Sequence, residues 1–278
     1  MWLLDRKKSG RFHLSRTAIL KNVGAQYIGL KEDESDQRII LMLSGGLLVH
    51  LGLMLLAILF GFLTRSWYFA GTWIFLNLSF FLNNVLPVGI TDGAKIWELL
   101  QHPENTQYAY LMLRHSAQTL LAPQEYDLKD FIMPVPEYAS GSFAASIQTL
   151  EGVVFLLDDH IELAKQQFQS VLEKTDNPMS KTISQLYLLQ IALMEGDNKK
   201  AEEYASIRGV KSFLSIKTAD MQVIQAWYQF KVKKDGVQTH KTMKIARQKM
   251  NSSRMLRDEK SYYQNWLAEL EKELTEGV

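Results

Sequence analysis

The sequence contains no cysteine among its 278 residues. That absence excludes disulfides, thiolate zinc sites, iron–sulfur clusters and a cysteine nucleophile. Charge is almost as scarce over one long stretch, because Arg65 is the single charged side chain between residues 39 and 90. The net charge of the whole chain is only +1, and no segment is basic enough to follow a phosphate backbone. A nucleic-acid partner is therefore not expected.

Two long apolar runs occupy the uncharged stretch, over residues 39–63 and 67–90. A helix of about 25 residues rises about 37 Å, which is enough to cross a hydrocarbon core of about 30 Å. Only Thr64, Arg65 and Ser66 separate the two runs, so they must run antiparallel. The sequence predicts a transmembrane helical hairpin in contact with membrane lipid.

The distribution of positive charge predicts the orientation of this hairpin. Residues 1–38 hold eight Lys and Arg residues, whereas the tip of the hairpin holds one. Because cytoplasmic segments near membrane spans are enriched in Lys and Arg, both outer ends are expected in the cytoplasm. We expect a multi-pass protein of the cell (inner or plasma) membrane, with a cytoplasmic segment at 1–38, a membrane domain at 39–100 and a cytoplasmic domain at 101–278.

The first apolar run contains one ionisable residue, His50. An ionisable side chain within a membrane span is a candidate functional group, because its burial in lipid is costly. The alternative is a neutral histidine that forms a hydrogen bond with a neighbouring helix.

A short polar motif follows the second run, with Asn84, Pro87 and the pair Asp92-Gly93. Pro87 breaks the helix because it lacks a backbone donor and clashes with the preceding turn. Asn84 can satisfy backbone groups that the break leaves free. Asp92 is expected at a tight turn, where its carboxylate can cap the following helix.

This N-x-x-P…D-G motif at the end of an uncharged span resembles that of the site-2-protease-like intramembrane metallopeptidases (the M50 family). The glycine-rich stretch from Gly45 to His50 is similar to a helix of that family, although the family has an asparagine where His50 stands. The resemblance covers roughly residues 1–100. It implies that Asp92 is a zinc ligand, and that Asn84 and Pro87 help to position the substrate.

The remaining ligands of that family are missing, because no H-E-x-x-H occurs in this sequence. Catalytic zinc needs three protein ligands and a base that activates water. Zinc is the cofactor of the family, but we do not expect this chain alone to bind it or to hydrolyse peptides. Two explanations stay open: a chain separated from its catalytic helix, by truncation or an interrupted gene, or a derivative that kept only a binding role.

The region from residue 102 onward has apolar positions at the spacing of amphipathic helices and few breaks. Gly152, Phe155, Ala164 and Phe168 resemble the core of a tetratricopeptide repeat. Ala201 and Tyr204 belong to a second, looser copy. The expected fold class is therefore all-α, with a transmembrane hairpin followed by a soluble α-solenoid.

Two functions follow from these patterns. In the first, the chain is the part of a site-2-protease-like zinc metallopeptidase that lacks the catalytic motif, and its helical repeats recognise a protein or peptide. In the second, it is a non-catalytic membrane-anchored scaffold that binds a protein partner. A helical bundle without any ligand is the structural alternative for the repeats.

Overall fold

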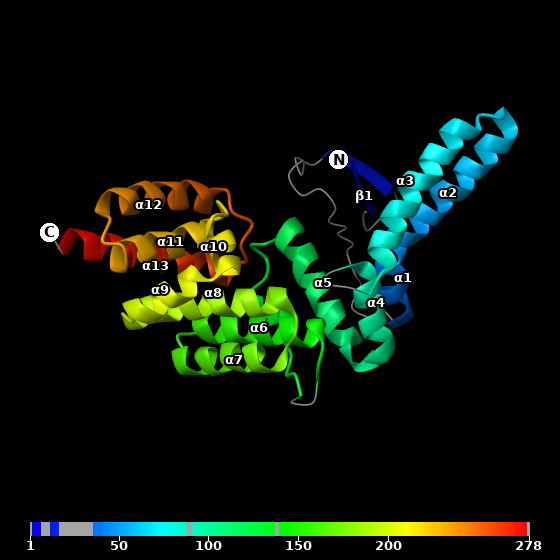
Figure 1. The fold of residues 1–278 in the computed structure, drawn as a ribbon. Coiled ribbons are helices and arrows are strands. Elements are labelled where there is room, and N and C mark those ends of the chain that lie inside the picture. The colour runs from blue at the N-terminus through cyan, green and yellow to red at the C-terminus, as the bar shows by residue number, and fades with distance from the viewer. Residues whose placement is uncertain (1, 7–11, 17–35, 88–90, 137–138, 277–278) are drawn as a thin grey trace.

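The computed structural model describes residues 2–6, 12–16, 36–87, 91–136 and 139–276 (Figure 1). Thirteen α-helices make up most of these residues, which confirms the helical fold class. The sequence did not predict the short strands β1 (Trp2–Arg6) and β2 (Phe12–Arg16), which pair antiparallel with Leu4 opposite Leu14.

The first apolar run forms two helices, α1 (Asp36–Leu43) and α2 (Gly45–Thr64), rather than one. The hydroxyl of Ser44, between them, donates a hydrogen bond to the carbonyl of Ile40 at 2.7 Å. A serine that bonds back to the preceding turn commonly bends a helix, and here it separates α1 from α2.

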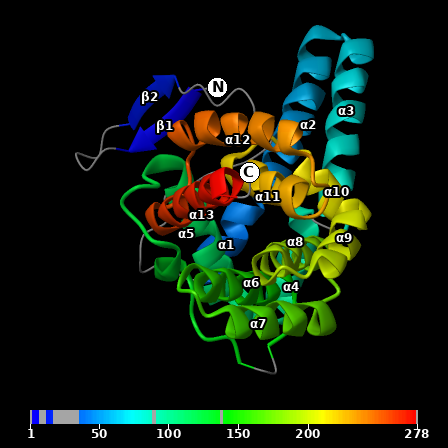
Figure 2. The ribbon, with the colours of Figure 1, turned by 90° about the vertical axis from the view of Figure 1, so that its left-hand side faces the viewer.

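The second apolar run forms α3 (Trp67–Val85), which lies beside α2 and runs antiparallel to it (Figures 1 and 2). Arg65, in the left-handed conformation at φ 56°, reverses the chain between them. A Cβ atom on Gly61 would lie 3.0 Å from the Cβ of Ala70, so small residues let the two helices approach closely.

Among the described helices, α2 alone is long and apolar enough to cross a membrane. The first apolar run therefore contains one candidate membrane-spanning helix, by its length and composition. The asparagines at 77, 83 and 84 lower the hydropathy of α3, and residues 88–90 of the second run lie outside the described residues.

The chain then passes through α4 (Asp92–Gln101), a 3₁₀ turn (Pro103–Asn105) and α5 (Thr106–Leu121). Apolar residues of α1, α4, α5 and α6 (Ser142–Leu157) share one hydrophobic core. Its members are Ile39, Leu43, Leu99, Tyr108, Ala109, Phe143, Ala144 and Ile147.

The remaining helices pack largely on their neighbours in sequence (Figure 1). They are α7 (Ile161–Lys174), α8 (Pro178–Glu195), α9 (Asn198–Ser206), α10 (Arg208–Leu214), α11 (Ala219–Lys231), α12 (Gly236–Asn251) and α13 (Arg257–Glu276). We call residues 142–276 the helical domain.

Side-chain caps fix where several of these helices begin. Asn177 accepts hydrogen bonds from the amides of Met179 and Ser180, while Asp197 and Asp235 each accept one at the start of α9 and α12. These short polar side chains satisfy amides that have no partner within the helix.

The first turn of α13 also contacts a distant part of the chain. Arg257 forms a bidentate ion pair with Asp127, and the amide of Leu128 donates to Asp258 at 2.7 Å. Leu128 opens a second 3₁₀ turn (Leu128–Phe131), so α13 is attached to the connection between α5 and α6.

Candidate functional site at the end of the α2–α3 pair

Thr91, and not Asp92, caps α4. Its hydroxyl oxygen accepts a hydrogen bond from the amide of Ala94 at 3.2 Å and donates one to the carbonyl of Leu86 at 2.6 Å. Asp92 is the first helical residue. The expectation that Asp92 caps the helix is therefore wrong, and its carboxylate is left for other contacts.

The glycine of the Asp92-Gly93 pair is required by packing. A Cβ atom at Gly93 would lie 2.1 Å from the carbonyl oxygen of Val85, in the last turn of α3, and 3.0 Å from that of Asn84. The start of α4 therefore lies directly against the end of α3. Gly93 is buried there, in a helix and not in a turn.

The carboxylate of Asp92 is directed toward the beginning of α2. Its Oδ2 atom lies 3.7 Å from the position that a Cβ on Gly46 would take. Its Oδ1 atom lies 3.7 Å from the ammonium of Lys95, and about a third of the side chain is exposed. Asp92 thus lies where α2, α3 and α4 meet.

Pro87 ends α3 as the sequence predicts. The helix stops at Val85, and Leu86 adopts the extended conformation that a following proline favours. Asn84 is half-buried in the last turn, two residues before this change. The substrate-positioning roles of Asn84 and Pro87 stay predictions.

His50 belongs to α2, and its side chain contacts α3. Its Nδ1 atom is 2.9 Å from Oδ1 of Asn77, and its ring stacks on Phe80. Asn77 donates from its amide nitrogen to the carbonyl of Trp73 at 2.9 Å. This geometry is that of the alternative interpretation, in which the histidine forms a hydrogen bond with a neighbouring helix.

The described residues do not fit a catalytic zinc ion. No three His, Asp or Glu side chains among them are grouped so that they could hold a metal. Asp92 has the cation Lys95 beside it, and Gly46 offers no donor atom. Three protein ligands are needed for such a site, so this part of the chain supplies at most one.

The predicted repeat core is brought together by α6 and α7. A Cβ at Gly152 would lie 2.7 Å from the ring of Phe168, so glycine is needed where these helices cross. Ala164 and Phe168 are fully buried, and Phe155 is half-buried against the same cluster. In the second predicted copy, Ala201 is buried and Tyr204 is half-buried.

A polar junction between α4 and α6 was missed by sequence reasoning. Oε1 of Glu98 accepts from the amide of Phe143 at 3.0 Å and from the side-chain amide of Asn105 at 3.2 Å. Its Oε2 accepts from the hydroxyl of Ser142. The carboxylate of α4 therefore caps α6. No local pattern indicates this, because the partners lie 44 and 45 residues away.

The fold and the site together define a helical protein with a protruding pair of apolar helices and a polar motif at the base of that pair. Comparisons with protein-family models, with curated proteins and with solved structures found no match.

Proposed function

We propose that this chain is a membrane-anchored protein in which α2 and α3 both lie in the bilayer and the helical domain binds a protein or peptide. The support is the exposed apolar surface of these two helices. Only 11% of the apolar window of α2 is buried, and the outward-facing Leu55, Phe62 and Phe75 are each 68% exposed. A surface of this kind, left in water, is an aggregation hazard.

Three polar side chains of α3, those of Thr72, Asn77 and Ser79, are compatible with lipid because they have partners inside the pair. Asn77 bonds to His50, and the hydroxyls of Thr72 and Ser79 donate to carbonyls one turn earlier, at 3.0 and 2.8 Å. Backbone and polar groups within a bilayer must find such internal partners. Hydropathy therefore understates how well α3 suits the membrane.

The absence of native cysteine permits a direct test of this topology. Ser66→Cys places a thiol at the tip of the α2–α3 pair, and Ser252→Cys places one at the exposed end of α12. In intact cells, a membrane-impermeant maleimide should label Ser66→Cys, whereas Ser252→Cys should react only after permeabilisation. Labelling of both from outside would mean that α2 alone crosses, and labelling of neither would contradict the predicted orientation.

We further propose that the base of the pair is a site-2-protease-like element that cannot cleave peptides by itself. The observation that carries this proposal is that the Asp92 carboxylate points toward Gly46 of α2 and does not cap α4. In this proposal the missing histidines and glutamate come from a helix outside this sequence, and the helical domain recognises the substrate or an adaptor.

Metal content tests the kinship. The chain should be purified in mild detergent, alone and together with any polypeptide bearing H-E-x-x-H that is encoded beside it, and its zinc measured by mass spectrometry. We expect no stoichiometric zinc in the chain alone and about one zinc per chain in the assembly. Asp92→Asn should remove that zinc, and Asp158→Asn, an exposed acid in the helical domain, should not.

The second candidate is a scaffold without any peptidase partner. It is favoured by the ion pair of Asp92 with Lys95, since the positive charge of the ammonium repels a metal cation at the same carboxylate. If the wild-type assembly binds no zinc, or if Asp92→Asn retains it, the kinship fails. The membrane anchor and the binding role of the helical domain would then stand alone.

A further inference from the structure

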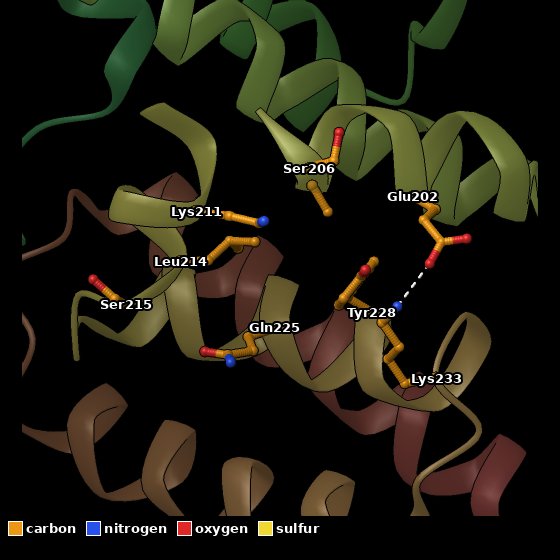
Figure 3. Close-up of a pocket in the computed structure, with 9 residues that line it drawn as sticks. Glu202, Ser206, Lys211, Leu214, Ser215, Gln225, Tyr228 and Lys233 are labelled. Carbon is orange, nitrogen blue, oxygen red and sulfur yellow. Dashed lines mark hydrogen bonds and ion pairs between the residues drawn. The ribbon is translucent and has the colours of Figure 1, made fainter. Parts of the chain in front are cut away.

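An open cavity of about 450 Å³ lies between α9, α10 and α11 (Figure 3). It exists because α10 is an additional short helix that packs against α8, α9 and α11. A Cβ at Gly209 would lie 2.7 Å from Thr182, so α10 approaches α8 closely at this point. The sequence did not predict α10, and a repeat of two helices leaves no place for it.

The walls of the cavity combine apolar surface with one satisfied ion pair. Leu214 and Ala205 are buried, and Tyr228 is half-buried. The ammonium of Lys233 lies 2.7 Å from Oε1 of Glu202 and 5.5 Å from the centre of the Tyr228 ring. This pair fixes one side of the cavity and carries no net charge.

Lys211 is the cation without a counter-charge. Its side chain extends from α10 toward the cavity (Figure 3), and it has no hydrogen bond or ion pair with any other described residue. Glu202 is the one acid among the lining residues, and it already forms an ion pair with Lys233. The cavity therefore presents one uncompensated positive charge beside an apolar wall.

We propose that this cavity binds an acidic peptide segment, with a carboxylate on Lys211 and an adjacent apolar side chain against Leu214 and Tyr228. The half-buried amide of Gln225 lines the same cavity and can both donate to and accept from a peptide backbone. The inference rests on the proposed role of the helical domain in binding a protein, and it names the chemistry of that partner.

The test uses the full chain in detergent and two fluorescein-labelled octapeptides, one alternating Leu and Glu and one alternating Leu and Gln. Fluorescence anisotropy should show tighter binding of the Leu-Glu peptide, weakening as salt rises because exposed charges are screened. Lys211→Gln should weaken binding of the Leu-Glu peptide about threefold to tenfold, the range for a charge-assisted contact at an open site.

Lys241→Gln, which removes an equal charge from the exposed face of α12, is the matched control and should leave the affinity unchanged. Equal binding of the two peptides, binding of neither, or equal effects of the two lysine substitutions would each overturn the proposal. These outcomes leave the membrane topology and the zinc content untouched, so failure here is distinguishable from failure of the proposed function.

Discussion

At the scale of the residue, Glu259 is the carboxylic acid of the helical domain whose pKa is shifted furthest. It lies in the first turn of α13 and accepts a hydrogen bond from the amide of Leu256 at 3.1 Å. Burial raises the pKa of its carboxyl group to about 7, although that hydrogen bond opposes the change. The folded protein therefore holds a proton on Glu259 that the unfolded chain releases at lower pH.

This proton predicts how stability depends on pH. Because the folded pKa lies above the ordinary value of 4.5, the contribution of Glu259 to the free energy of unfolding should fall as pH rises from about 4.5 to about 7. The loss should approach about 3 kcal/mol. Burial lowers the pKa of His115 to about 4, so His115 acts in the opposite direction between about pH 4 and 6.5. The effect of Glu259 is therefore the difference in stability between wild type and Glu259→Gln, which keeps an acceptor for Leu256. Urea denaturation of the two proteins at several pH values measures the difference.

Asp127→Asn provides a control for that experiment. Its ion pair with Arg257 lowers the pKa of Asp127, so its contribution acts in the opposite direction and below the window of Glu259. If the stabilities of wild type and Glu259→Gln change in parallel between pH 4.5 and 7, the carboxyl of Glu259 contributes nothing to the pH dependence.

The motif at 84–93 shows which local features can be predicted from single residues and which cannot. The proline break was predicted correctly, because the effect of Pro87 is local. The cap was assigned to Asp92 and belongs to Thr91. Threonine and aspartate are both good N-cap residues. Thr91 is the cap because its backbone is extended while that of Asp92 is already helical, and the sequence does not show where this change occurs.

At the scale of the element, the close contact between α3 and α4 requires a residue without a side chain at Gly93. A methyl group on Gly93 would meet the carbonyl of Val85, which is part of the backbone and cannot turn aside. The two helices would have to separate. The position of Asp92 relative to α2 depends on the same contact.

Gly93→Ala should therefore destabilise the protein by about 1 to 3 kcal/mol, the usual cost of overpacking. Gly71→Ala is the matched control in α3, since nothing lies within 4 Å of its added methyl group. It should be neutral or slightly stabilising, because alanine favours helix. Thermal unfolding in detergent, followed by circular dichroism, compares the two. Equal melting temperatures would show that α4 does not lie so close to α3.

Helix ends were predictable where a capping residue or a proline or glycine marks them. The pairs Asn177-Pro178, Gly196-Asp197 and Asp235-Gly236, whose residue types favour breaks, all lie at observed helix ends. The division at Ser44 and the helix α10 were missed. At Ser44 the chain bends through a side-chain hydrogen bond, and α10 begins at Arg208 without a side-chain cap.

At the scale of the whole molecule, periodicity was enough for the helical class, because each amphipathic helix records its buried face in its own sequence. The long-range contacts leave no such record. Asp127 and Arg257 pair across 130 residues, and nothing in the sequence near either residue indicates its partner. The solenoid arrangement and the second membrane span stay predictions. The first depends on how distant helices stack on one another, and the second on whether lipid surrounds α3, and a local sequence pattern specifies neither.

The cap that Glu98 provides for α6 has a mechanical consequence. One carboxylate joins the helix that carries the N-x-x-P…D-G motif to the first helix of the helical domain, through the amide of Phe143 and the hydroxyl of Ser142. We expect that α4 cannot rotate on its axis without exposing the first turn of α6. A displacement of α4 would therefore be passed directly to the start of α6 through these two hydrogen bonds.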